Sequence, residues 1–169
     1  MPRFAGLIPP LCTPLTEDRS IDVASLERLI SFQIEAGADG IFVLGSSGEA
    51  AYLNDADRCT VVASAVGAVA GQVPVLVGAL DTATERVIDH VRRLESFPIN
   101  AVVVTASFCA NPSAAEITTH FRAIHGSTET PVVAYNIPGY VRRRIPVEVA
   151  LELLESGVIV GLKDSPRIR

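Results

Sequence analysis

Near its C-terminal end the chain reads Val158-Ile159-Val160-Gly161-Leu162-Lys163-Asp164-Ser165, and this stretch decides how the rest is interpreted. A short apolar run that ends in one lysine is typical of a buried strand that carries an amine to the mouth of a pocket, where the amine can form an imine. The alternative is a lysine whose charged end simply reaches water. Lys163 is therefore a candidate nucleophile, and the remaining sequence has to decide between the two interpretations.

Apolar runs of strand length recur along the whole chain, and turn clusters and segments of helical periodicity separate them. The runs cover residues 7–12, 41–44, 75–77, 101–105, 132–135 and 159–162. Runs this short, rich in Val, Ile and Leu, indicate strands that are buried on both faces. The sequence therefore predicts six strands.

The intervening segments carry start and stop signals of helices. These signals are Asp22 with Gly37, Asn54 with Gly71, the capping box Ser113-Ala114-Ala115-Glu116, and Pro146 in the first turn of a helix over 147–155 that Gly157 ends. Five helices are predicted to alternate with the six strands.

Strict alternation of strands and helices favours parallel strands with right-handed crossovers, as in a doubly wound sheet or a closed (β/α)8 barrel. No Gly-x-Gly-x-x-Gly motif follows the first strand, which counts against a dinucleotide-binding sheet. We therefore predict an α/β fold of the TIM-barrel family. Because a closed barrel needs eight units and about 250 residues, we expect residues 1–169 to be the N-terminal part of one barrel domain, with strands seven and eight and a C-terminal helical region missing.

Composition excludes several classes of function. The chain is 49% hydrophobic with a net charge of −5, and its only dense basic cluster is residues 142–144, so nucleic acid is not an expected partner. No apolar stretch reaches the length of about 18 residues that a membrane span requires. Cys12, Cys59 and Cys109 lack metal-ligand spacing and fit reduced thiols in the cytoplasm. His90, His120 and His125 fall in or near helical segments and are expected at the surface.

Two further motifs follow predicted strands. The loop Gly45-Ser46-Ser47-Gly48-Glu49 offers two hydroxyls and several backbone N–H groups that can hold a carboxylate, although a plain turn has the same composition. Tyr135 ends the run 132–135, where its phenol can exchange a proton with a reacting oxygen. The alternative for Tyr135 is a half-buried side chain bonded to a backbone carbonyl.

The predicted fold brings these weak signals together. Ser46, Ser47, Tyr135 and Lys163 each follow a strand, and the carboxyl ends of all barrel strands open on one face, where barrel active sites lie. An amine, a phenol and a hydroxyl-lined seat for an anion are the groups needed for imine chemistry on a 2-oxo acid.

The same motifs, in this order, resemble those of the dihydrodipicolinate synthase / N-acetylneuraminate lyase family of class I, Schiff-base aldolases, over residues 6–165. The resemblance implies a lyase in which Lys163 forms a Schiff base with pyruvate or a related 2-oxo acid and Tyr135 shuttles protons. It further implies that Ser47 holds the substrate carboxylate and that Ser46 takes part in a proton relay. No metal or other cofactor is implied, and a complete barrel would form a homo-oligomer, a dimer or a tetramer.

Two departures from the family pattern concern the substrate. Where dihydrodipicolinate synthases have Pro-Tyr-Tyr, this chain has Ser107-Phe108-Cys109, so Cys109 replaces the second tyrosine. Tyr140 stands where those enzymes place an arginine, with Arg142 nearby. A 2-oxo sugar acid is therefore a better expected substrate than the partners of the lysine-pathway condensation.

Two other functions remain open at this point. A catalytically inactive, truncated paralogue that acts as an assembly partner is favoured by the six-strand count. A phosphate-binding isomerase barrel is less favoured, because such barrels usually bind phosphate after strands seven and eight. An incomplete barrel would also expose apolar core, so self-association is expected.

Overall fold

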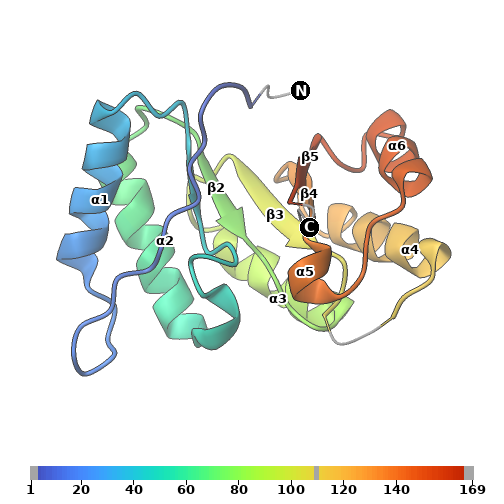
Figure 1. Ribbon diagram of the computed structural model, residues 1–169, viewed down its shortest axis with the longest axis horizontal. Helices are drawn as coiled ribbons and strands as arrows, with labels where there is room; N and C mark the ends of the chain where they lie inside the picture. The colour runs from blue at the N-terminus through green and yellow to red at the C-terminus, as the bar shows by residue number, and fades with distance from the viewer. Residues whose placement is uncertain (1–3, 109–110, 166–169) are drawn as a thin grey trace. The chain divides into compact units, whose positions relative to one another are not determined.

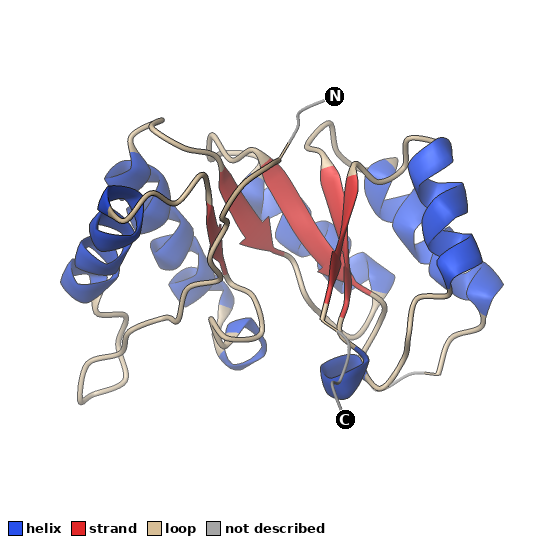
Figure 2. Ribbon diagram, turned by 45° about the horizontal axis from the view of Figure 1, so that its top comes forward, coloured by secondary structure: helices blue, strands red, loops and turns tan. Residues whose placement is uncertain are grey.

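The computed structural model describes residues 4–108 and 111–165, which divide into two compact units. The N-terminal unit comprises residues 4–78 and 93–100. The C-terminal unit comprises the described residues of 79–92 and 101–165. Each unit combines parallel strands with helices (Figures 1 and 2), as expected of an α/β fold.

The N-terminal unit pairs two short parallel strands and packs two helices against each other. Its elements are α1 (Val23–Glu35), β1 (Ile41–Val43), the 3-10 helix η1 (Ala50–Tyr52), α2 (Asp55–Val69) and β2 (Val75–Gly78). Ile41 lies opposite Val75 in the β1–β2 pair. Leu26 and Ile30 of α1 and Val61 of α2 are fully buried, so apolar faces of both helices form the core of this unit.

The C-terminal unit contains three parallel strands in consecutive order. Its elements are most of α3 (Thr84–Leu94), then β3 (Ala101–Thr105), α4 (Ala114–His125), β4 (Val132–Asn136), α5 (Pro138–Val141), α6 (Val147–Glu155) and β5 (Gly161–Asp164). The register places Thr105 of β3 opposite Tyr135 of β4, and Tyr135 opposite Lys163 of β5. Side chains that follow these strands therefore gather at one edge of this sheet.

The predicted helix starts are confirmed. The side chains of Asp22 and Asn54 accept hydrogen bonds from the backbone N–H groups three residues further on, at 3.0 and 2.9 Å. Ser113 and Glu116 form the predicted capping box. Pro146 is the N-cap residue of α6, one position before the predicted first turn.

The predicted strand over residues 7–12 is wrong. Within the described residues this segment makes one isolated parallel bridge, Pro10 opposite Phe42, flanked by hydrogen bonds from Leu11 N to Phe42 O (2.8 Å) and from Phe42 N to Pro9 O (3.2 Å). Pro9 and Pro10 have no N–H to donate, so a continuous ladder cannot form. Five strands rather than six are therefore found in the described part of the chain. Two short helices, η1 and α5, were not predicted.

The prediction that the histidines lie at the surface holds for His125 and is wrong for the other two. His90 and His120 are only 9% and 4% exposed. Both lie on the inner faces of their helices and have polar partners there: His120 contacts Thr84 Oγ1 through Nδ1 and donates from Nε2 to Thr105 O, while His90 Nε2 contacts Asp81. A buried imidazole is tolerated where both ring nitrogens can be satisfied.

No helix in the described ranges is long and apolar enough to cross a membrane.

Candidate functional site

Tyr135 and Lys163 lie side by side in the C-terminal unit. They occupy directly opposed positions of β4 and β5, so both side chains project from the same face of the sheet. Lys163 Nζ lies 3.9 Å from the centroid of the Tyr135 ring. This distance is well within the range of a cation–π contact. Each is the penultimate residue of its strand, whereas the sequence predicts a position directly after the strand.

The two side chains of this pair differ in their exposure to water. Tyr135 is only 3% exposed, and Lys163 is half-buried. Lys163 Nζ also donates a hydrogen bond of 3.1 Å to Ser165 Oγ. The amine is therefore held by a ring below it and a hydroxyl beside it, instead of extending freely into solvent as the alternative interpretation required.

Ser46 and Ser47 lie in the N-terminal unit, in the loop between β1 and η1. Ser46 is half-buried and Ser47 is exposed. Glu49 has a left-handed backbone (φ 56°), and its N–H donates to Ser46 O at 3.2 Å. Thr13 Oγ1 donates to Gly48 O at 2.7 Å, which ties the loop to the segment before α1. The sequence motif thus forms a braced turn with the Ser47 hydroxyl at its surface.

A close approach of backbones explains the glycines of this loop. A Cβ at Gly48 would lie 3.1 Å from both the carbonyl oxygen of Leu11 and the amide nitrogen of Leu44. A Cβ at Gly45 would lie 2.8 Å from the Phe42 ring. A side chain at Gly48 would press on backbone atoms, and one at Gly45 would require the Phe42 ring to move, so glycine suits both positions.

The structure therefore brings Tyr135 and Lys163 together and places Ser46 and Ser47 in the other unit. The meeting of all four in one pocket remains a prediction.

The two departures from the family pattern differ in what the structure shows. Tyr140 packs edge-on against Phe108, with ring centroids 5.5 Å apart, and thereby links α5 to the loop after β3. Arg142 is exposed, whereas Arg143 Nη1 donates to Asn111 Oδ1 at 3.2 Å. Cys109 lies outside the described residues.

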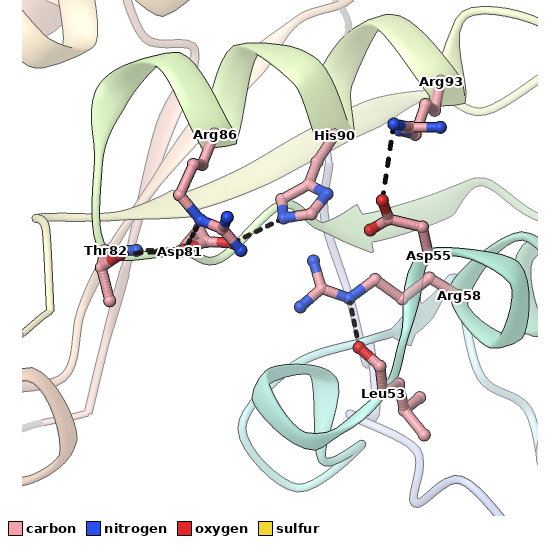
Figure 3. Close-up of polar contacts among 8 residues, drawn as sticks. All are labelled: Leu53, Asp55, Arg58, Asp81, Thr82, Arg86, His90 and Arg93. Atoms are coloured by element: carbon pink, nitrogen blue, oxygen red, sulfur yellow. Dashed lines mark hydrogen bonds and ion pairs between the residues drawn. The ribbon is translucent and has the colours of Figure 1, made fainter.

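Sequence reasoning missed a polar cluster around Asp81 (Figure 3). Asp81 Oδ1 accepts hydrogen bonds from Arg86 Nε at 2.7 Å and from Thr82 N at 2.6 Å, and Oδ2 contacts His90 Nε2 at 2.8 Å. Burial raises the pKa of Asp81, but the hydrogen bonds from Arg86, Thr82 and His90 outweigh it and hold the pKa well below its usual range. The cluster ties the first turns of α3 to the loop before it, which is a structural role.

A cavity of about 530 Å³ lies elsewhere in the C-terminal unit, between the starts of α3 and α4. Its lining includes Thr84, Ser107, Glu116 and His120, and neither Tyr135 nor Lys163 contributes to it. The cavity does place a hydroxyl beside an imidazole, since Thr84 Oγ1 lies 2.9 Å from His120 Nδ1. We give more weight to the strand ends, because they hold the amine and the phenol that the sequence motifs single out. In the described ranges no group of three His, Cys, Asp or Glu residues could hold a metal ion.

Comparison with known proteins agrees with the family resemblance that the motifs suggested. The sequence model described as "Dihydrodipicolinate synthetase family" matches residues 3–167. A 4-hydroxy-tetrahydrodipicolinate synthase of Laribacter hongkongensis is 36% identical over 162 residues, which is 96% of this chain and 56% of the relative. The synthase of Shewanella sp. strain ANA-3 is 34% identical over 160 residues, 95% of this chain and 54% of the relative. The chain thus spans about half the length of the curated relatives it matches.

Solved structures give the same result for the fold. Dihydrodipicolinate synthase from Aquifex aeolicus matches with a TM-score of 0.92 at 27% identity, over 98% of this chain and 56% of that one. YagE, a prophage protein of the dihydrodipicolinic acid synthase family from E. coli K12 solved in complex with pyruvate, matches with a TM-score of 0.93 at 30% identity, again over 98% and 56%. The predicted fold class, an incomplete TIM-barrel α/β fold, is confirmed.

Proposed function

The chain belongs to the dihydrodipicolinate synthetase family, and from this premise we propose that it is the N-terminal part of a lyase in which Lys163 forms a Schiff base with pyruvate or a related 2-oxo acid. The observation that carries the proposal is the pairing of Lys163 with Tyr135 at the ends of adjacent strands, 3.9 Å from amine to ring centroid. A family member has been solved with pyruvate bound, which supports a 2-oxo acid as the ligand.

The proposed reaction begins with attack of the neutral Lys163 amine on C2 of the 2-oxo acid. The amine nitrogen gives up one proton and the carbonyl oxygen takes one up, which gives a carbinolamine; a second proton then lets that oxygen leave as water, so that a protonated imine remains. The imine then accepts the electron pair released when a bond at C3 breaks, which gives an enamine. Because the protonated imine is itself the electron sink, the proposal needs no metal or other cofactor.

Tyr135 is the proposed proton carrier for these steps. The Tyr135 side chain is buried, and Tyr135 lies directly opposite Lys163 in the register of β4 and β5. A general acid or base in such a position typically contributes about 10²- to 10⁴-fold to a rate.

In the proposed complete site, Ser47 binds the substrate carboxylate and Ser46 relays protons to Tyr135. The exposed hydroxyl of Ser47 on a braced loop is consistent with an anion seat, since the seat must be open before substrate arrives. The proposal also includes a cytoplasmic location and a homo-oligomer in the full-length context.

A 2-oxo sugar acid is the substrate class we propose. Tyr140, which replaces an arginine of the synthases, packs against Phe108 and offers no positive charge for a second carboxylate. A substrate with a polyhydroxylated tail has no such carboxylate to bind.

The proposal is tested by incubating the chain with pyruvate and sodium borohydride and mapping the product by mass spectrometry. We expect one reduced pyruvyl group on Lys163, none on the Lys163→Ala variant, and labelling slowed by about 10²-fold or more in Tyr135→Phe. Circular dichroism confirms that each variant is folded. A folded chain that acquires no label at Lys163 would reject the proposal.

A second candidate function is an inactive assembly partner of family members. The observation that favours it is exposed apolar surface on β5, where Leu162 is 42% exposed. Absence of labelling combined with co-purification of a full-length family member would support this function. An isomerase with a phosphate site is not supported by any further observation.

A further inference from the structure

We propose that Asn136 is a positioning residue that holds Lys163 and Tyr135 in their reactive arrangement from the opposite face of the sheet. This inference deepens the proposed function and rests on it. Asn136 directly follows Tyr135 in β4, and Asp164 directly follows Lys163 in β5. Since successive side chains of a strand point to opposite faces, Asn136 and Asp164 share the face that the reactive pair does not use.

The Asn136 side chain joins three segments. Its Nδ2 donates to Asp164 Oδ1 at 2.7 Å, and its Oδ1 accepts from the backbone N–H of Ile145 at 3.0 Å. Its backbone carbonyl accepts from Ser165 N at 2.9 Å. Asn136 therefore connects the end of β4 to the end of β5 and to the loop before α6.

The amide is buried while its partner is not. Asn136 is 4% exposed, whereas Asp164 is exposed. A buried amide that both donates and accepts gives a unique side-chain orientation, which an apolar residue of the same size cannot give.

The consequence for the site follows from the position of the bonds. Within the described residues β5 pairs with β4, and Lys163 is the penultimate residue of β5, with Ser165 directly after the strand. Asn136 thus bonds to the two residues that follow Lys163: its side chain donates to Asp164, and its backbone carbonyl accepts from Ser165 N. Ser165 in turn accepts the hydrogen bond from Lys163 Nζ, so the same clamp sets the partner of the amine.

The hydrogen-bond pattern can be tested by swapping the amide and the carboxylate between positions 136 and 164. In Asn136→Asp, two carboxylates would face each other where a donor now meets an acceptor, and the clamp should open. In the double variant Asn136→Asp/Asp164→Asn, the new carboxylate can accept from both Ile145 N and the new amide, so the clamp should close again. Asp164→Asn alone keeps a donor–acceptor pair and serves as the matched single control.

The readout is the rate of borohydride trapping on Lys163 as a function of pyruvate concentration. We expect the limiting rate of Asn136→Asp to fall by about 10- to 100-fold, because small misplacements of reacting groups have effects of that size, with less change in the half-saturating pyruvate concentration. The double variant should regain most of the wild-type rate, and Asp164→Asn should keep it. Ile124→Val, a core change in α4 remote from the site, controls for a general loss of stability.

The outcomes separate the two proposals. If the wild-type chain is not labelled, the proposed function fails, and hydrogen exchange at the amides of Ile145 and Ser165 still tests the clamp: their protection should drop in Asn136→Asp and return in the double variant. If the wild type is labelled but Asn136→Asp reacts at the wild-type rate, or Ile124→Val is slowed equally, or the double variant shows no recovery, the positioning role is overturned.

Discussion

At Asp81 the balance between burial and hydrogen bonding decides the charge of a single side chain. The carboxylate is 8% exposed, yet Arg86, Thr82 and His90 give it enough hydrogen bonds to remain ionised. Such a group contributes its full stabilisation only while the carboxyl is also ionised in the unfolded chain. At lower pH, unfolding takes up a proton, and the stabilisation declines until the folded chain is protonated as well.

We therefore predict an acid-dependent stability contribution from Asp81. Its pKa is lowered on folding from 3.8, so the contribution is complete above about pH 5 and is lost as the pH falls toward the lowered value. Between about pH 5 and pH 3 the stability advantage of the wild type over Asp81→Asn should shrink by about 1 kcal/mol. Urea unfolding of both chains at the two pH values measures this, and a constant difference would contradict it.

His120 shows the opposite chemistry, a base kept neutral by its surroundings. Burial lowers its pKa, and the hydrogen bond to Thr105 and the charge of Glu85 only partly offset this effect. Nε2 donates to Thr105 O, which leaves Nδ1 as the acceptor for the Thr84 hydroxyl.

Because the folded pKa of His120 lies below that of the unfolded chain, its contribution to stability is complete above about pH 6.5 and decreases as the pH falls through the folded value. Between about pH 7.5 and pH 5 the wild type should lose stability relative to His120→Gln, whose amide can make the same two bonds without titrating. Denaturant unfolding across this range provides the measurement. Parallel pH profiles of the two chains would mean that folding does not lower the pKa of His120, which would contradict the argument.

Among the secondary-structure elements, β2 depends on a close approach that only glycine permits. A Cβ at Gly78, the last residue of β2, would overlap the carbonyl oxygen of Leu44, which itself has a left-handed backbone with φ 55°. Gly67 in α2 is different, because nothing lies within 4 Å of the position of its Cβ.

The two glycines make a matched pair of predictions. Gly78→Ala should destabilise the chain by about 1–3 kcal/mol or more, because backbone atoms cannot yield as a side chain can. Gly67→Ala should stabilise it by about 0.5–1 kcal/mol, since alanine restricts the unfolded chain and suits a helix. Urea midpoints compare the variants directly, and similar effects at both positions would contradict the argument.

The elements themselves were largely predictable from local signals. Capping residues such as Asn54 and Ser113 are recognised by chemistry that acts within one helical turn, so the helix starts are correct. The run over residues 7–12 is as apolar as a strand, but its two prolines remove the donors that a ladder needs, and this signal against a strand is already present in the sequence.

The site was predictable only where strand order carries the information. Tyr135 and Lys163 end consecutive parallel strands, so their proximity follows from topology. Asn136, Asp164 and the cluster at Asp81 depend on side-chain directions and on contacts across loops. No periodicity or spacing in the sequence encodes these contacts.

For the molecule as a whole, the reactivity of Lys163 depends on how much of the full barrel surrounds it. The match covers 96% of this chain and 56% of the Laribacter hongkongensis synthase. In the C-terminal unit, β5 carries the proposed nucleophile together with Leu162, which is 42% exposed. Leu162 lies on the face opposite to Lys163, and the amine itself is only half-buried. A half-buried amine is better hydrated than an amine in a closed pocket, and hydration disfavours imine formation.

We therefore predict that the remaining part of a relative, supplied as a separate chain, raises the reactivity of Lys163. Co-expression with the segment of the Laribacter hongkongensis synthase outside the matched region should increase borohydride trapping of pyruvate on Lys163 by about 10-fold or more, because the added strands would cover β5 and exclude water. Mass spectrometry of the separated chains assigns the label. Lys163→Ala with the same partner should show no label on this chain, and the partner mixed with unfolded chain should show no gain. Equal trapping with and without the partner would mean that residues 1–169 already hold everything the imine step requires.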